Sequence, residues 1–370
     1  MASKILNFLK SEIVLTASWV LALASMFFVP PDKAYPGYID FHTLGLLFAL
    51  MAVMASLQGM GLFRRLGGAL LRKTRTTRQL ECVLILLPFF TGMLVTNDVA
   101  LITFVPFALE VLALAGREKR AIPVVAMQTV AANLGSMATP IGNPQNLFLY
   151  SHYEMSFGSF FGAVLPYAAL SLVLILLFLL VSRSQPLTAL SLHREEAPLP
   201  RGRVALLAIL FLLCLATVAK LIPLWPVCLA VLAALLITDR KALLGVDYCL
   251  LLTFVGFFVF VGNLGRIPVF TEFFRSILQG HEVLCAVAVS QVISNVPAAL
   301  LLSGFTDRGA DLLVGVNLGG LGTLIASMAS LISYKYIARS GASKGKYLGW
   351  FTAANVIFLA VLLVFWIVLR

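Results

Sequence analysis

The sequence predicts an all-α polytopic membrane protein with about nine transmembrane helices and two re-entrant hairpins, arranged in two inverted repeats. Three observations support this fold class: the composition, the spacing of apolar runs, and the distribution of positive charge between loops. Of the 370 residues, 61% are hydrophobic and only 12% are charged, about half the charged share of a soluble domain. A soluble fold of this length cannot bury so much apolar surface, so we expect the chain to lie in a lipid bilayer.

Apolar runs of roughly spanning length recur along the chain, since a membrane span needs about 20 apolar residues. They cover 13–29, 41–62, 82–115, 121–150, 157–182, 204–222, 225–238, 248–265, 283–305, 312–334 and 347–369. The start resembles a cleavable signal peptide, because Lys4 and Lys10 precede a short apolar stretch and Ala22-Leu23-Ala24. The run continues to Phe28, which favours an uncleaved first helix.

The run 82–115 is too long for one span and too short for two comfortable ones. Six Lys and Arg residues within 64–78 precede it and three within 117–120 follow it, which places both ends in the cytoplasm. Its middle is Thr96-Asn97-Asp98, a sequence that suits a buried tip better than lipid. We therefore expect either two short crossing helices or a hairpin that enters from the inside.

The run 283–305 raises the same question, because its middle is Ser294-Asn295-Val296-Pro297. Counting the crossings places its flanks outside, so this hairpin would enter from the outside. On this topology 21 Lys and Arg residues lie in the cytoplasm and 6 outside, which favours nine crossings with the N-terminus inside. The net charge of +11 is then explained by the excess of Lys and Arg on the cytoplasmic side of an inner or plasma membrane, and no nucleic-acid partner is expected.

Two stretches of the sequence resemble each other. Residues 133–147 and 317–331 are identical at six of fifteen aligned positions without a gap, and most of the other positions pair small residues. Chance similarity between apolar, glycine-rich segments is the alternative. The predicted organisation is an N-terminal helix, a first inverted repeat, a linker with two scaffold helices, and a second inverted repeat, at 1–38, 39–182, 183–245 and 246–370. Inverted repeats with interrupted helices are typical of secondary transporters.

Several protein classes are excluded by missing motifs. The sequence has no GxxxxGK[ST] motif for nucleotide-driven pumping. Its four histidines show no HExxH spacing and its five cysteines form no CxxC pair. No nucleophile or metal set for a membrane-embedded enzyme is found, so we expect a protein that is not an enzyme. It would need no cofactor apart from Na⁺ or H⁺ as a coupling ion.

The sequence Gly142-Asn143-Pro144 interrupts an otherwise apolar helix, close to Pro140. Proline removes a backbone donor and glycine weakens a helix, so we expect an unwound turn at mid-membrane depth. Such backbone is tolerated where it is buried or lines a cavity. Its free carbonyls suit Na⁺, and the exposed N-termini of helices suit an anion. The alternative is that these residues, like those of the tips, only cap short helices.

Asp98 is the acidic residue placed most clearly at membrane depth. A carboxylate there is costly and usually functional. Three roles compete for it: a cation ligand, a proton carrier or an ordinary helix cap. We favour a role in ion coupling.

These features together resemble the citrate transporter-like permeases of the ion transporter superfamily, over about residues 40–370. This superfamily includes divalent-anion/sodium symporters and the arsenite and sodium/proton antiporter branches. The resemblance implies one cation site at Thr96, Asn97 and Gly142 and another at Ser294, Asn295 and Ala326. It also implies that the substrate contacts Asn97, Asp98, Asn143, Pro144, Asn295, Val296 and Ser327.

The chain departs from the symporter pattern at three positions. Asp98 and Val296 stand where the tips of the symporters carry threonine, and Met328 replaces the proline of the second turn. Losing two hydroxyls and gaining a carboxylate argues against a dicarboxylate carried with two sodium ions. Asp98 is more similar to the arsenite-type branch, for which proton coupling is expected.

The sequence therefore predicts a secondary active transporter of a small anion or oxyanion, carboxylate-like or arsenite-like, coupled to H⁺ or Na⁺. The resemblance implies a homodimer and an elevator-type movement of the hairpin domain. The alternatives are a sodium/proton-type cation antiporter, in which Asp98 binds the cation, and a channel, since re-entrant hairpins also serve channels.

Overall fold

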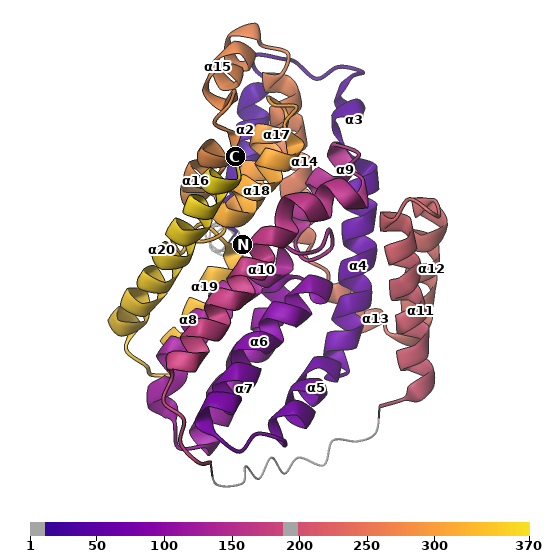
Figure 1. Cartoon of the computed structure of the whole chain (residues 1–370). Helices are drawn as coiled ribbons and strands as arrows, with labels where there is room; N and C mark the ends of the chain where they lie inside the picture. Colours follow the sequence, from indigo (N-terminus) through magenta and orange to yellow (C-terminus); the bar gives the residue numbers. More distant parts are fainter. Residues whose placement is uncertain (1–11, 188–198) are drawn as a thin grey trace.

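The computed structural model describes residues 12–187 and 199–370, and its regular structure is helical (Figure 1). One isolated bridge between Thr76 and Pro186 is the β pairing found in this part of the chain. The all-α prediction is confirmed. Lys4 and Lys10, on which the signal-peptide alternative depends, lie outside the described residues.

The first half of the chain begins with two helices, α2 (Ile13–Ser25) and α3 (Tyr35–Tyr38). The helices that follow are α4 (Phe41–Gly59), α5 (Leu62–Leu71), α6 (Thr77–Val95), α7 (Asn97–Leu114), the 3₁₀ turn η1 (Glu118–Arg120), α8 (Ala121–Ser136), α9 (Pro144–His152) and α10 (Phe157–Val181). The apolar run 82–115 is thus a helical hairpin, α6 and α7, with Thr96 between its legs. The run 121–150 is broken between α8 and α9, at the glycine and proline residues that predicted the break.

The second half begins with two helices that pack on α4, together with a short third one. These are α11 (Arg201–Val218), α12 (Leu224–Thr238) and α13 (Arg240–Leu244). The helices that follow are α14 (Tyr248–Leu264), α15 (Pro268–Leu278), α16 (Glu282–Ile293), α17 (Asn295–Ser303), α18 (Gly309–Gly319), α19 (Met328–Arg339) and α20 (Lys344–Leu369). The run 283–305 is the second hairpin, and the run 312–334 is broken between α18 and α19.

The helices α4 to α10 and α14 to α20 follow one another in the same order. Both series start with an aspartate that caps the first helix: Asp40 accepts the Thr43 N–H at 2.9 Å, and Asp247 accepts the Leu250 N–H at 2.8 Å. In both, a short amphipathic helix (α5 or α15) leads into the hairpin. This parallel supports two related units, although their inverted orientation and the boundaries at 39–182 and 246–370 stay predictions.

Six helices in the described ranges are long and apolar enough to cross a membrane: α4, α6, α7, α10, α11 and α20. The count rises to seven if α14 and α15 form one span, but the two helices meet at a bend of 103°. Pro268 opens α15 and causes this break, because it cannot donate a hydrogen bond to a continuing helix. Several other predicted spans are shorter helices, so the number of nine crossings stays a prediction.

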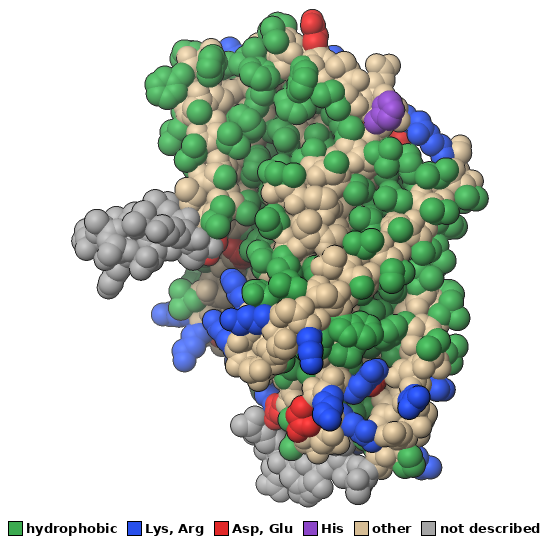
Figure 2. All heavy atoms as spheres, turned by 90° about the vertical axis from the view of Figure 1, so that its left-hand side faces the viewer, with side chains coloured by type: hydrophobic (Ala, Val, Ile, Leu, Met, Phe, Trp, Pro, Cys, Tyr) green, Lys and Arg blue, Asp and Glu red, His purple; other side chains and the backbone are tan. Residues whose placement is uncertain are grey.

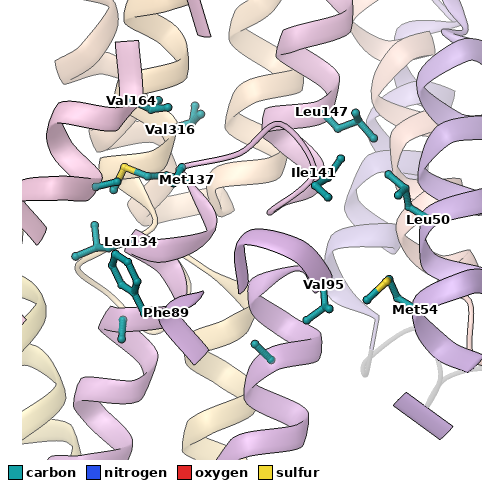
Figure 3. Packing of buried hydrophobic residues seen from close by; sticks show 14 of the residues in the cluster. Leu50, Met54, Phe89, Val95, Leu134, Met137, Ile141, Leu147, Val164 and Val316 are labelled. Carbon is teal, nitrogen blue, oxygen red and sulfur yellow. The ribbon is translucent and has the colours of Figure 1, made fainter. Parts of the chain in front are cut away.

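Each hairpin packs against the broken helix that follows it, α6 on α8 and α16 on α18. Gly135 makes the first contact possible, because a Cβ there would lie 2.1 Å from the Phe89 carbonyl oxygen. Buried apolar side chains close the joint, with Phe89 of α6 lying beside Leu134 of α8 (Figure 3). The backbones of the hairpin and the broken helix therefore touch.

The surface divides along the length of the molecule. In the face shown in Figure 2, hydrophobic side chains cover the upper part and most of the blue Lys and Arg side chains gather near the lower end.

The structure pairs Glu81, only 3% exposed, with Arg120 through two hydrogen bonds of 2.6 and 2.7 Å. This ion pair ties the base of the first hairpin to the turn that precedes α8.

Candidate transport site

The tips of the two hairpins share one backbone conformation. Thr96 has φ 73° and ψ 152°, and Ser294 has φ 77° and ψ 155°. This region is essentially reserved for glycine and costs about 1–3 kcal/mol for other residues. Non-glycine residues persist there when the surroundings over-determine them, as they do at functional sites.

Each tip is joined to the broken segment that the sequence predicted to face it. The Asn97 N–H donates to the Gly142 carbonyl oxygen at 3.2 Å, and the Asn295 N–H donates to the Ala326 carbonyl oxygen at 3.0 Å. The two contacts are equivalent in position and use the main chain on both sides. Gly142 itself is tightly held, since an added Cβ would lie 2.0 Å from the Ser136 carbonyl oxygen.

A buried asparagine connects the first tip to the second broken segment. The Asn133 side-chain oxygen accepts hydrogen bonds from Asn97 Nδ2 at 2.9 Å and from Ser327 Oγ at 3.1 Å. Its Nδ2 donates to the Gly320 carbonyl oxygen at 3.3 Å. Asn133 is 4% exposed, so this network lies inside the protein and links the two halves of the chain.

A cavity of about 190 Å³ opens where the two tips and the two broken segments meet. It is lined by residues of α7, α9, α17 and α19, and also by residues at the start of α2 and α14. Seven residues predicted for the site line it: Asn97, Asp98, Pro144, Ser294, Asn295, Val296 and Ser327. The structure therefore brings together most of the substrate-binding set and part of the cation-binding set.

Four predicted residues do not line this cavity: Thr96, Gly142, Asn143 and Ala326. Asn143 is 2% exposed, and its side chain accepts the Asn146 N–H at 3.0 Å as the N-cap of α9. The Ala326 carbonyl oxygen accepts a hydrogen bond from Ser294 Oγ at 3.4 Å as well as the one from the Asn295 N–H. The carbonyls expected to bind Na⁺ thus already receive hydrogen bonds from protein donors.

Asp98 occupies the first turn of α7, where the helix dipole favours a negative charge. Its backbone N–H donates to Asn97 Oδ1 at 3.0 Å. Its carboxylate accepts no hydrogen bond from the described residues, and Oδ1 is buried. A helix-capping carboxylate would accept a backbone N–H, so the described contacts give no support to the capping role.

Sequence reasoning missed other residues of the lining, among them Glu12, Gln145, Asp247, Thr253 and Lys335. Gln145 follows Pro144 directly, so its place beside the broken segment could have drawn attention to it. Asp247 caps α14 as Asp40 caps α4, yet nothing in the sequence placed it near Asp98. Glu12 and Lys335 carried no signal, because each reaches the cavity through the packing of a helix distant in sequence.

Comparison with known proteins decides the family. A family model described as "Citrate transporter" matches residues 5–306, well over half of the chain. The chain belongs to this citrate transporter family. It is therefore a multi-pass membrane transporter and not an enzyme.

Individual relatives agree with this assignment. The family member described here is 31% identical over 325 residues to the inner membrane protein YbiR of Escherichia coli, covering 85% of both chains. It is 39% identical to the silicon efflux transporter LSI3 of rice over 138 residues, which are 37% of this chain and 28% of LSI3. The YdaH transporter of Alcanivorax borkumensis shares the fold, with a TM-score of 0.58, 14% identity, and coverage of 90% of this chain and 86% of the other.

Proposed function

We propose that the protein is a secondary active transporter of a small oxyanion or of its parent hydroxylated acid, coupled to proton movement through Asp98. The observation that carries this proposal is the buried carboxylate oxygen of Asp98, which has no partner among the described residues and faces the cavity between the tips. A buried carboxylate without a partner favours taking up a proton. The silicon efflux activity in the name of LSI3 supports an oxyacid as cargo.

Proton coupling is favoured over sodium coupling because the carbonyl oxygens that face the tips already accept hydrogen bonds from the protein. Na⁺ would require oxygen ligands that are free to turn toward it. At the second tip the Ala326 carbonyl oxygen receives two donors, the Asn295 N–H and Ser294 Oγ. These donors compete with a cation for the two lone pairs of this oxygen. Asp98 needs no rearrangement to accept a proton.

A second candidate function has its own observation. Among the described residues, the charged side chains that line the cavity are three carboxylates, those of Glu12, Asp98 and Asp247, and one ammonium group, that of Lys335. This acidic balance favours a cation over a multiply charged anion. A sodium/proton-type antiporter, in which Asp98 binds cation and proton alternately, is therefore the alternative.

The hydrogen bonds between tips and broken segments support an elevator-type movement. Main-chain contacts at both tips and the side-chain network around Asn133 join the hairpins to α8, α9, α18 and α19. A unit joined in this way would move as one body past α4, α11 and α12. The cytoplasmic N-terminus, the cell membrane location and the homodimer belong to the same proposal.

Flux through proteoliposomes tests the function. The purified protein is reconstituted, and uptake of silicic acid, arsenite, citrate and succinate is measured under an imposed pH gradient or Na⁺ gradient. We expect uptake of an oxyacid to follow the pH gradient and to lose this dependence in Asp98→Asn with the fold retained. Asp307→Asn, an exposed aspartate in the loop before α18, is the matched control.

Two outcomes separate the proposal from its alternatives. Movement of Na⁺ against protons without any of the four acids would favour the cation antiporter. Saturable uptake that ignores both gradients would rule out the coupling, and unchanged coupling in Asp98→Asn would remove Asp98 from the mechanism.

A further inference from the structure

Two buried polar atoms in the cavity lining have opposite hydrogen-bonding capacity. Asp98 Oδ1 is an acceptor and Gln145 Nε2 is a donor, and neither has a hydrogen-bond partner in the described structure. Gln145 is 1% exposed. Leaving such groups unsatisfied costs about 1–3 kcal/mol each, so natural proteins rarely do so without a functional reason.

Three other polar side chains that line the cavity do not satisfy these atoms because each donates elsewhere. Asn97 donates to Asn133 at 2.9 Å, and Ser327 also donates to Asn133, at 3.1 Å. Thr253 donates to the Cys249 carbonyl oxygen at 2.7 Å. A molecule that enters the cavity therefore finds one free buried acceptor, on Asp98, and one free buried donor, on Gln145.

A hydroxyl group complements this pair, since it donates one hydrogen bond and accepts others. A fully deprotonated oxyanion offers only lone pairs, which suit Gln145 but are repelled by Asp98 while its carboxylate is deprotonated. Carboxylates that face each other as like charges are strongly disfavoured in a buried site. The complementary ligand is therefore an oxyacid that keeps at least one hydroxyl hydrogen when it binds.

We infer that Gln145 and Asp98 form a hydroxyl-recognition pair, in which Gln145 is a substrate-binding residue that donates to an oxygen of the cargo and Asp98 selects hydroxylated oxyacids over deprotonated oxyanions. This inference rests on the proposed function, because it assumes that the cavity between the tips holds the cargo. It adds a residue that no motif predicted and a criterion that depends on the protonation of the cargo. The size of the cavity, about 190 Å³, suits a small ligand.

Binding and transport of two kinds of tetrahedral or trigonal compound test the inference. Silicic, arsenous and boric acids keep their hydroxyl groups at neutral pH, whereas sulfate carries none. Ligand-induced thermal stabilisation of the purified protein reports binding, and proteoliposome uptake reports KM. We expect the wild type to bind at least one of the three acids and to bind sulfate more weakly.

The variant Gln145→Met keeps the length of the side chain and removes the donor. We expect KM for the hydroxylated acid to rise about 3- to 10-fold, as for the loss of one neutral hydrogen bond, while kcat changes little. Any binding of sulfate should weaken by a similar factor, because the donor of Gln145 serves both ligands, so the preference for the hydroxylated acid should persist through Asp98. Gln279→Met makes the same chemical change on an exposed residue at the end of α15, outside the cavity, and should behave as the wild type.

Three results would overturn the inference: wild-type protein that binds none of the three acids, a wild-type preference for sulfate, or an unchanged KM in a folded Gln145→Met. Failure of the proposed function has a different signature. In that case the acids bind and Gln145→Met weakens the binding, but no flux follows the pH gradient.

Discussion

Asn317 and Asn143 are joined by a buried hydrogen bond of 3.1 Å, from Asn143 Nδ2 to Asn317 Oδ1. Asn317 also donates to Asn146 Oδ1 at 2.6 Å and to the Leu313 carbonyl oxygen at 2.8 Å. This arrangement mirrors that of Asn133, its counterpart in the aligned stretch, which contacts Ser327 in the other half. The two asparagines thus reach reciprocally across the boundary between the two halves of the chain.

Replacing Asn317 should weaken the joint between these halves. In Asn317→Leu the buried amide of Asn143 loses an acceptor and the oxygen of Asn146 loses a donor, at a cost of about 1–3 kcal/mol for each unsatisfied group. We expect a clear fall in the melting temperature in detergent. Ser276→Ala, which removes an exposed hydroxyl from α15, should leave it unchanged, and equal melting temperatures of all three proteins would contradict the role of Asn317.

Breaking the ion pair at the base of the first hairpin should lower the free energy of unfolding more than breaking an exposed ion pair does. Arg120→Met leaves Glu81, 3% exposed, as a buried carboxylate with only the Ser182 hydroxyl at 2.8 Å. We expect a loss of about 3 kcal/mol, at the lower end for a broken buried pair, because Arg120 is itself partly exposed.

A double variant distinguishes the effect of the lost ion pair from the effect of lost packing. If the unpaired charge causes the damage, Glu81→Gln combined with Arg120→Met should regain part of the stability, as measured by protein remaining soluble after heating. No difference between the single and the double variant would favour packing as the cause.

The contact of Gly135 with α6 should tolerate no side chain. An alanine there would place Cβ 2.1 Å from a carbonyl oxygen of the Phe89 backbone, so the hairpin would have to move. We expect Gly135→Ala to lower both the melting temperature and transport. Gly349→Ala, in an open part of α20 with no atom within 4 Å, should be neutral or stabilising by up to about 1 kcal/mol.

The exposed pair of Asp32 and Arg266 predicts a dependence of stability on pH. The hydrogen bond from Arg266, at 2.7 Å, and then that from the Ala34 N–H hold the pKa of the Asp32 carboxyl below its usual value. A lowered pKa contributes stability above the unfolded-state pKa of about 3.9 and loses it as the pH falls through the folded-state value.

We therefore expect Arg266→Gln to melt slightly below the wild type at pH 7, and the difference to shrink when the pH falls below about 4. The effect should be small and reduced by salt, because both side chains are more than 40% exposed. A difference that grows as the pH falls would have the wrong sign for this pair.

The parts of the fold that depend on breaks in the apolar pattern could be predicted from the sequence. Polar tips at 96–98 and 294–295 and the Gly-Asn-Pro break marked both hairpins and the first broken helix, because uncompensated polar groups are rare in a bilayer. Seven residues predicted at these breaks line the cavity. The helix α15 could not be predicted, because it lies between the apolar runs 248–265 and 283–305 and is too short to span a membrane.

The polar partners inside the site could not be predicted in the same way. Asn133 and Asn317 were recognised as similar positions, but which groups they bond depends on how helices distant in sequence pack. Gln145 directly follows the Gly142-Asn143-Pro144 break, but its free donor became visible only when neighbouring groups were found to be paired. Glu12, Asp247 and Lys335 reach the cavity from three separate helices.

The joints at Thr96 and Ser294 rely on the main chain, N–H to carbonyl, and so do not depend on which side chains occupy the following positions. This explains how Asp98 at one tip and Val296 at the other can coexist within the same geometry. Natural variation can thus change the side chains that contact the cargo while the main-chain hydrogen bonds at the tips stay the same. A grafted tip from a relative with another cargo is accordingly a practical starting point for redesigning selectivity.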